Sequence, residues 1–330
     1  MRAITYEKFG PAREVLRLQE IDSPAPGPGE VRVRLALSGV NPSDVKARAG
    51  TRPGVTKPAF PLIVPHSDGA GEIEAVGAGV DPARIGQGVW IWNGQWQRSH
   101  GTAASHITLP AQQAVPLPNG VDFDVGASLG IPGLTACHAV FGGGDVAGET
   151  VLVQGGAGTV GRLAVQLAKW GGARVIATCS AADRDRVVAA GADAVFDYGA
   201  GDLAAQVLDA NDGMPVGTVV EVEFGLNIAA DTALIAANGR LAAYGSAQMM
   251  EPTLSFGPLL FKAVTIDIIL IYLLRPAQRA RAIDRLHHAL ADGALDCPTE
   301  RILPLAETAA AHEAVEKGGR NGAILVDCQG

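Results

Sequence analysis

Residues 151–161 read VLVQGGAGTVG, and this stretch decides the fold. An apolar run enters the pattern Gly156-x-Gly158-x-x-Gly161, and RLAVQLAKW follows with helical spacing. A buried strand, a tight glycine turn and a helix N-terminus in this order are typical of a Rossmann unit. In such a unit the backbone N–H groups and the helix dipole face a diphosphate, and a side chain at Gly158 would block its approach. The stretch therefore predicts a dinucleotide site, in preference to a purely structural glycine turn.

The chain around this turn alternates between short apolar runs and helical segments. Six strands separated by helices predict a doubly wound parallel sheet, and the most apolar of them is expected to be a buried strand. The predicted strands cover residues 150–154, 174–178, 194–197, 218–223, 240–244 and 264–271.

The first third of the chain has a different texture, with short strand-like bursts punctuated by Gly and Pro. This pattern predicts an irregular β-rich domain. After Arg275 a helix to about residue 291, a strand, a second helix and a last strand read as a return to that domain. The expected division is a catalytic domain from residues 1–122 and 273–330, and a Rossmann domain from residues 123–272.

Composition excludes several classes of protein. The 330 residues carry a formal charge of −8, which argues against nucleic-acid binding as the main role. The four cysteines are scattered without a CxxC pair, and the N-terminus has no apolar signal core. We expect a cytoplasmic protein without a membrane span. Four arginines on one predicted helix read as a solvated face: Arg275, Arg279, Arg281 and Arg285.

Several motifs carry a resemblance to a known family. They are GPGEVRVRLALSGVNPSDVKARAG, PHSDGAGEIEAVGAGV, GASLGIPGLTACHAV, the glycine turn with its helix, and HEAVEKGGRNGAILV. Together they resemble the medium-chain dehydrogenase/reductase superfamily, and within it the zinc-free quinone oxidoreductase branch that includes zeta-crystallin. The resemblance covers essentially the whole chain and implies a GroES-like catalytic domain beside the Rossmann domain.

The metal positions of the superfamily are altered in this chain. Zinc-dependent members place Cys at the start of the element matching Asn41-Pro-Ser-Asp44, His-Glu where Ser67-Asp68 stands, and a second Cys at Ile131. A catalytic zinc needs about three protein ligands, and Asp68, even with nearby His66, does not supply them. We expect no metal.

The resemblance implies a small set of catalytic candidates. Asn41 would lie beside the nicotinamide and donate to an acceptor carbonyl, or it would only cap its loop. Asp44 would orient the loop or cap the next helix. Lys46 stands where many relatives have Tyr, and it either stabilises an enolate or semiquinone oxygen or is a surface lysine. His66 is a candidate general acid, with a hydrogen-bonded structural histidine as the alternative.

The cofactor is expected to be NADP(H). No carboxylate follows the second strand until Asp183, and Ser180 stands at its end. Arg184 and Tyr198 match the Lys and Tyr with which bacterial quinone reductases hold the 2′-phosphate, and Asp183 is expected to cap a helix. The resemblance adds further cofactor contacts, at Asn41, Thr135, Gly156, Ala157, Gly158, Thr159, Val160, Gly161, Asn227, Gly245, Ser246, Ile269, Leu270, Ile271, Asn321 and Gly322.

The resemblance thus implies an NADPH-dependent, zinc-independent reductase of quinones or related α,β-unsaturated carbonyls. Two alternatives stay open: an enoyl or alkenal reductase that reduces C=C bonds, and an NADPH-binding protein with little turnover. The expected partners are a small-molecule quinone or enone and a second copy of the chain. The homodimer would form through the edge of the cofactor sheet, where residues 264–271 could serve.

Overall fold

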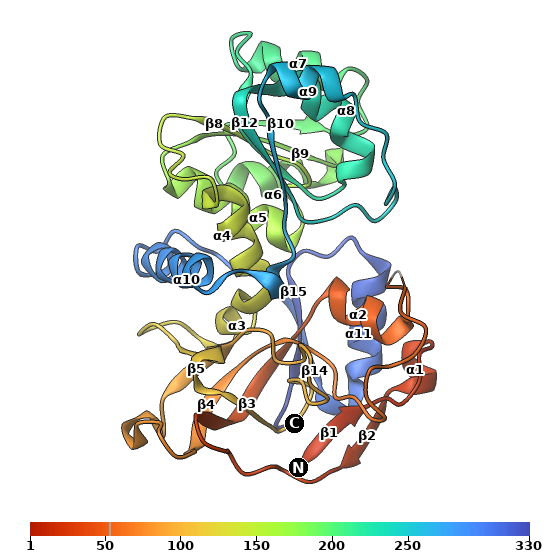
Figure 1. Cartoon of the computed structure of the whole chain (residues 1–330), viewed down its shortest axis with the longest axis vertical. Coiled ribbons are helices and arrows are strands. Elements are labelled where there is room, and N and C mark those ends of the chain that lie inside the picture. Colours follow the sequence, from red (N-terminus) through yellow and green to blue (C-terminus); the bar gives the residue numbers. More distant parts are fainter. Residues whose placement is uncertain (53) are drawn as a thin grey trace. The chain divides into compact units, whose positions relative to one another are not determined.

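The computed structural model describes residues 1–52 and 54–330. The chain forms two compact units, residues 1–131 with 297–330, and residues 132–296 (Figure 1). These boundaries differ from the expected ones at 122 and 272. The second boundary lies later because helix α10 (Pro276–Ala291) packs on α4 (Leu134–Phe141), where Cys137 Sγ donates to the Ala282 carbonyl at 3.5 Å.

The second unit contains a six-stranded, fully parallel sheet in the order β10-β9-β8-β11-β12-β13. This order is that of the doubly wound dinucleotide-binding fold, so the predicted fold class is confirmed. The strands are β8 (Thr150–Val153), β9 (Arg174–Cys179), β10 (Ala194–Asp197), β11 (Val216–Glu221), β12 (Ile235–Ala243) and β13 (Thr265–Ile268). The helices are α4, α5 (Thr159–Trp170), α6 (Arg184–Ala189), α7 (Leu203–Ala210), α8 (Phe224–Leu234), α9 (Phe256–Phe261) and α10.

Burial explains why the central strands are apolar on both faces. Val151, Leu152 and Val153 of β8 are fully buried, as parallel strands covered by helices require. The expectation of a buried strand over residues 264–271 is wrong: β13 is the edge of the sheet, and Ile268 is 69% exposed. The edge position itself agrees with the other expectation for residues 264–271, that they lie at the edge of the cofactor sheet.

Two segments have an irregular backbone. Residues 125–141 do not form one continuous helix, because Pro132 lies in a π-helical turn (Leu129–Gly133) between α3 (Phe123–Gly126) and α4. The segment 246–261 contains the short helix α9. Two 3₁₀ turns complete this unit, η4 (Ala181–Asp183) and η5 (Ile271–Leu273).

The first unit is built on a seven-stranded sheet with the path β14-β15-β3-β4-β5-β7, with β6 also paired to β3, and on a two-stranded sheet β1-β2. Its strands are β1 (Arg2–Thr5), β2 (Arg17–Glu20), β3 (Glu30–Val40), β4 (Asp68–Val76), β5 (Gly88–Ile91), β6 (His106–Pro110), β7 (Ala114–Pro116), β14 (Thr299–Pro304) and β15 (Ala323–Asp327). Its helices are α1 (Ala12–Val15), α2 (Pro42–Ala49), α3, α11 (Thr308–Lys317) and the 3₁₀ turns η1 (Pro82–Arg84), η2 (Ala111–Gln113) and η6 (Leu305–Glu307).

Both ends of the chain contribute to this unit. β15 pairs antiparallel with β3, and the C-terminal elements lie beside the N-terminal strands in Figure 1. Ile4 and Val40 share one apolar core with Val315 and Ile324. The irregular β-rich domain expected from the sequence is therefore completed by the last residues of the chain.

The arginine-rich helix α10 is only partly a solvated face. Arg279 is buried and donates to the Ile271 carbonyl at 2.9 Å, and burial lowers its pKa to about 10. Across the described residues, 1–52 and 54–330, no helix combines the length and the apolar character needed to cross a lipid bilayer.

Candidate functional site

The glycine turn connects β8 to the N-terminus of α5. Gly158 is the N-cap of α5 and is exposed, whereas Gly161 is buried in the first turn. The first N–H groups of a helix have no partner within it, so the start of α5 offers donors and a partial positive charge to an anion. The structure thus brings together the six predicted turn residues: Gly156, Ala157, Gly158, Thr159, Val160 and Gly161.

A buried polar chain holds the start of this turn. The Gly155 N–H donates to Thr178 Oγ1 at 3.1 Å, and Thr178 Oγ1 donates to Gln154 Oε1 at 2.7 Å. Gln154 Nε2 then donates to Asp231 Oδ1 at 3.0 Å. Thr178, Gln154 and Asp231 are at most 1% exposed. The turn is therefore anchored through side chains of β9 and α8, and its position is fixed before any ligand arrives.

Two buried acids, Asp231 and Glu221, lie at the end of this series of hydrogen bonds. Glu221 closes β11, and its carboxylate accepts from Asn227 Nδ2 at 3.1 Å and from the Glu223 N–H. Burial raises the pKa of Glu221, and burial together with the Glu221 charge raises that of Asp231 well above its ordinary value. We infer that the pair holds one proton in common, because two adjacent charges in this core would be costly. The predicted cofactor residue Asn227 is thus committed to Glu221.

Just after the carboxyl end of β9, the negative charge of Asp183 is balanced by neighbouring side chains. Ser180 Oγ donates to Asp183 Oδ2 at 2.7 Å, and Arg186 forms an ion pair with the same carboxylate. These hydrogen bonds outweigh partial burial and lower the pKa of Asp183. Asp183 occupies the N-cap position of α6, as expected, but its side chain makes no capping hydrogen bond there. Arg184 NH1 donates to the Val195 carbonyl, and Tyr198 is 61% exposed.

The remaining predicted cofactor residues of this unit lie at several strand ends. Thr135 is buried in α4. Ser246, which follows β12 with Gly245, accepts from the Gly225 N–H at 2.9 Å. Ile269 and Ile271 are buried after β13, whereas Leu270 is 49% exposed. The Ile269 N–H donates to the Ala243 carbonyl at 2.8 Å, so one of the three backbone groups proposed for the nicotinamide amide is already used.

In the first unit, Asn41 links two buried carboxyls. The Asn41 N–H donates to Asp44 Oδ2 at 2.8 Å, which closes the start of α2, and Asn41 Nδ2 donates to Asp68 Oδ2 at 2.8 Å. Asn41 is 9% exposed. The Asn41 side chain is also hydrogen-bonded to the Asp44 carboxyl, so its amide is shared between the two acids. Asp44 therefore orients the loop at the start of α2, which was one of its two expected roles.

The two carboxyls differ strongly from exposed acids. Burial, opposed by the hydrogen bond from Asn41 and by Arg52, raises the pKa of Asp44 to about 7. Burial and the nearby Asp44 raise the pKa of Asp68 well above its ordinary value. Asp68 is fully buried, so we infer that it is protonated at neutral pH.

His66 lies in a buried imidazole pair. Its backbone φ is 77°, a left-handed conformation that is uncommon outside glycine, and its side chain is enclosed. His66 Nε2 lies 2.8 Å from His312 Nε2, and His66 Nδ1 lies 2.9 Å from Ser38 Oγ. Burial lowers the pKa of His66 to about 3. Both ring nitrogens are thus engaged inside the protein, which favours the structural alternative for His66 over a general acid.

The other predicted residues of the first unit are not gathered with these groups. Lys46 is exposed on α2, which favours a surface lysine. The Asn321 N–H donates to the Glu300 carboxylate, and Gly322 precedes β15. Within residues 1–52 and 54–330, His, Cys, Asp and Glu side chains nowhere gather in groups of three that could hold a metal ion.

Sequence reasoning missed the residues beneath the glycine turn. Gln154, Thr178 and Glu221 stand at or near the carboxyl ends of otherwise apolar strands. A polar residue in such a place is the available signal, because the carboxyl ends of parallel strands form the ligand crevice of this fold. Asp231 gives no comparable signal, since it lies in the middle of α8.

Two family models match the chain. The alcohol dehydrogenase GroES-like domain matches residues 27–119, and the zinc-binding dehydrogenase model matches residues 159–288. The first matched segment lies within the first unit, and the second lies within the second unit.

Individual relatives agree with the models. Rat quinone oxidoreductase (Rattus norvegicus) is 34% identical over 254 residues, which are 76% of this chain and 75% of that protein. The solved structure of an NAD-dependent alcohol dehydrogenase has a TM-score of 0.85 at 30% identity and covers 99% of both chains. A mycobacterial protein solved in complex with NADPH has a TM-score of 0.85 at 29% identity, again over 99% of both chains. The chain therefore belongs to the quinone oxidoreductase branch of the medium-chain dehydrogenase/reductase superfamily of oxidoreductases.

Proposed function

We propose that this oxidoreductase is an NADPH-dependent, zinc-independent reductase of quinones or related α,β-unsaturated carbonyls. The observation that carries the proposal is the glycine turn at the N-terminus of α5, held by the buried chain from Thr178 to Asp231. A relative named quinone oxidoreductase and a neighbour that was solved with NADPH support the choice of acceptor and cofactor.

The turn has the space that a dinucleotide needs. A Cβ atom on Gly158 would meet only the Gly155 carbonyl oxygen, at 3.6 Å, so the volume next to its backbone is open. The N–H groups of the first turn of α5 would hold the pyrophosphate there. When bound, the nicotinamide supplies a hydride, and an acceptor that takes this hydride and one proton is reduced by two electrons.

The protein groups proposed for the acceptor lie around Asn41. Its amide is held by hydrogen bonds to Asp68 and Asp44, and it is a donor that needs no change of protonation. An amide N–H that turned from one of these carboxyls to an acceptor oxygen would stabilise the charge that develops there. The superfamily's zinc positions hold an amide, a hydroxyl next to a carboxyl, and an alkyl side chain, at Asn41, Ser67-Asp68 and Ile131, which is a poor donor set for zinc.

The proposed activity is tested by following NADPH oxidation with 1,4-benzoquinone, a naphthoquinone and a panel of enones, before and after treatment with a chelator. We expect turnover that survives chelation, with a hydroquinone as the product from quinones. A saturated ketone as the preferred product would instead identify a C=C reductase. Failure of the NADPH-bound protein to turn over any acceptor would refute the catalytic proposal and leave a cofactor-binding protein.

We expect the charge of Asp183 to limit the preference for NADPH. In Rossmann folds the end of the second strand faces the adenosine ribose, and a carboxylate there repels a 2′-phosphate. Replacing Asp183 with Asn keeps an acceptor for Ser180 Oγ and releases Arg186. The ratio of kcat/KM for NADPH over NADH should rise by about tenfold. Asp185→Asn on the same helix is the matched control and should leave the ratio unchanged, and an equal ratio in both variants would contradict the assignment.

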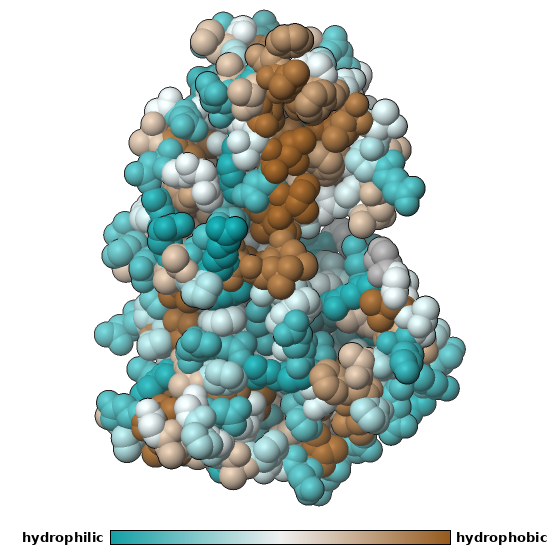
Figure 2. Space-filling view, viewed as in Figure 1, coloured by the Kyte–Doolittle hydropathy of each residue, from teal (hydrophilic) through white to brown (hydrophobic). Residues whose placement is uncertain are grey.

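We also propose that two copies pair through β13. Figure 2 shows a band of apolar surface on the second unit, and Ile268 on the edge strand and Phe261 just before it are 69% and 90% exposed. An unpaired strand edge with apolar side chains favours pairing with another chain. Light scattering should find a dimer for the wild type and a monomer for Ile268→Lys. Ile302→Lys, on the edge strand β14 and 51% exposed, should remain dimeric. A dimeric Ile268→Lys protein would exclude this interface.

A further inference from the structure

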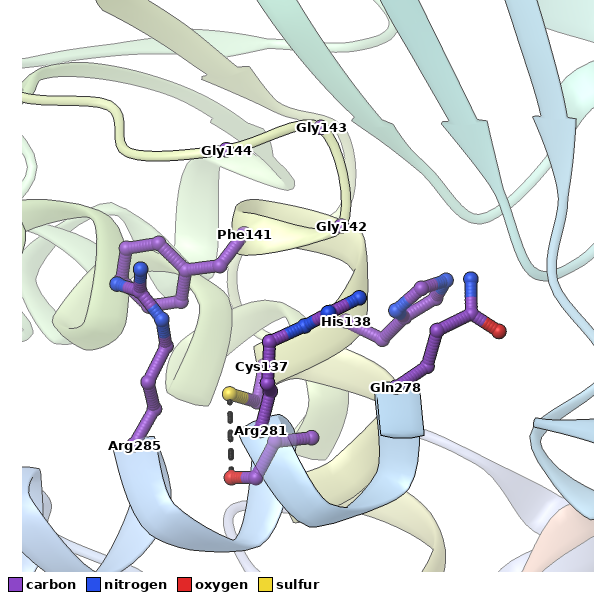
Figure 3. A pocket seen from close by; sticks show the side chains of 10 residues that line it. Cys137, His138, Phe141, Gly142, Gly143, Gly144, Gln278, Arg281 and Arg285 are labelled. Carbon is purple, nitrogen blue, oxygen red and sulfur yellow. Dashed lines mark hydrogen bonds between the residues drawn. The ribbon is translucent and has the colours of Figure 1, made fainter. Parts of the chain in front are cut away.

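A pocket lies within the second unit, between α4 and α10. Its volume is about 280 Å³, just below the usual range for sites of drug-sized ligands. Figure 3 shows side chains that reach it from the end of α4 and from one face of α10. The lining residues are Cys137, His138, Phe141, Gly142, Gly143, Gly144, Gln278, Arg281, Ala282 and Arg285.

The polar lining consists of cations and hydrogen-bond donors. None of the lining residues is acidic, and two are arginines. Within the part of the chain that the structure describes, Arg281 has no hydrogen-bond or ion-pair partner. Gln278 Oε1 already accepts from the Arg275 N–H at 3.2 Å, so the donor end of its amide remains for a ligand. Arg281 and Arg285 are one helical turn apart, so both guanidinium groups face the same side of α10.

Arg240 removes the charge that would otherwise repel an anion here. The last carbonyls of α4 carry partial negative charge at the pocket. Arg240 donates to the carbonyls of Ala139 and His138, at 2.5 and 3.1 Å, and is paired with Asp267. A Cβ atom on Gly142 would lie 2.4 Å from Arg240 NH2, so glycine is needed for this close approach. The guanidinium of Arg240 therefore offsets the partial negative charge at the C-terminal end of α4.

The second arginine is held in place by the protein. The Arg285 guanidinium lies 4.3 Å from the centre of the Phe141 ring, and it forms an ion pair with Asp145. Asp145 is 78% exposed at its side chain, so the solvent screens that pair. A guanidinium that is fixed by an aromatic ring loses little conformational entropy when it binds an oxyanion.

We propose that this pocket binds a phosphate group, either as inorganic phosphate or as the phosphate of a small ester. Two guanidinium groups on one helix face match a compact dianion, because each planar fork can donate two parallel hydrogen bonds to its oxygens. The neutral amide of Gln278 would complete its hydrogen bonds, whereas His138 Nε2 lies 3.6 Å from Asp267 Oδ2 and would act on the phosphate through its charge state. The small volume excludes a whole dinucleotide, so this site is separate from the glycine turn.

The pKa of His138 offers a measurement that reports on this pocket alone. The charged groups that face it are Asp267 from β13, Arg240 from β12 and Arg281 from α10. Burial and Arg240 lower its pKa, although Asp267 opposes them. A bound dianion would stabilise the imidazolium, so phosphate should raise the pKa of His138 and phosphate affinity should increase as the pH falls.

The test is a titration of the full chain with inorganic phosphate and with methyl phosphate, followed by calorimetry and by NMR of labelled histidines. Saturable binding with a raised His138 pKa is expected. Arg281→Gln should weaken it by about tenfold or more, and Arg275→Gln, at the N-cap of the same helix and outside the lining, by less than about twofold. Tighter binding of methyl phosphate assigns the site to esters, and tighter binding of phosphate to the free ion.

Phosphate bound at the glycine turn would not move His138 and would be insensitive to Arg281. Equal affinities in wild type and Arg281→Gln, or a His138 pKa that phosphate leaves unchanged, would overturn the proposal. Neither measurement depends on reductase activity, so the phosphate site and the proposed reductase function are tested independently.

Discussion

Gly158→Ala should weaken NADPH binding by about a hundredfold or more, equivalent to about 3 kcal/mol, while the melting temperature of the free protein stays unchanged. The Gly158 backbone has φ −70° and ψ 163°, which alanine adopts without strain. The added methyl group would meet only the Gly155 carbonyl oxygen, at 3.6 Å, an ordinary contact. It would therefore cost nothing in the fold and would occupy the space proposed for the pyrophosphate.

Gly161→Ala is the matched variant with the opposite expectation for stability. There the Cβ atom would lie 2.1 Å from the Gly155 carbonyl oxygen and 2.9 Å from its carbon, and a backbone clash cannot be relieved by a rotamer change. We expect a loss of about 3 kcal/mol in the free energy of unfolding. Denaturant unfolding and fluorescence titration with NADPH measure both quantities. Unchanged NADPH affinity in Gly158→Ala would show that the dinucleotide does not lie on this turn.

The second large effect is the pH dependence of stability through Asp44. Its pKa is about 7 in the folded chain against 3.8 for the free group. Between these values the folded state holds a proton that the unfolded state has lost, so the free energy of unfolding falls by up to about 1.4 kcal/mol for each pH unit. The full loss, about 4 kcal/mol, is reached as the pH rises through 7 and then stays constant.

Asp44→Asn should remove this part of the pH dependence. The amide oxygen of the variant can still accept the Asn41 N–H, so the start of α2 keeps its hydrogen bond. Urea unfolding at pH 5, 6, 7 and 8 measures the difference between variant and wild type, which cancels the other titrating groups. We expect the variant to gain stability relative to wild type as the pH rises. A difference that does not vary with pH would mean that Asp44 is ionised throughout.

Local patterns predicted most of the architecture. The glycine turn, the apolar strands and the helical spacing after Gly161 identify a parallel sheet because each is a property of neighbouring residues. The place of β13 was predicted only in part: residues 264–271 were expected to be buried and also to form the sheet edge that pairs two copies, because an apolar run is compatible with both. The burial of Arg279 was equally hidden, because its acceptor is the Ile271 carbonyl on another element.

The site was predicted only in part for the same reason. Sequence reasoning identified Asn41 and Asp44, which are neighbours at the start of α2. It did not reveal that Asp68, from β4, accepts the Asn41 amide, or that His312 faces His66. Such pairs join residues that are far apart in the chain, and a single sequence carries no sign of them. Their altered pKa values follow from that burial.

The position of β15 between β14 and β3 bears on how the chain folds during synthesis. The nucleotide-binding unit is complete once residue 296 has left the ribosome, whereas β3 still lacks its C-terminal neighbour. Until the last strand emerges, one side of β3 has unpaired backbone groups and the apolar cluster around Ile4 and Val40 lacks Val315 and Ile324. The strands that precede the nucleotide-binding unit in the chain therefore complete their sheet only after that unit, and during this interval the unpaired side of β3 would be open to chaperones.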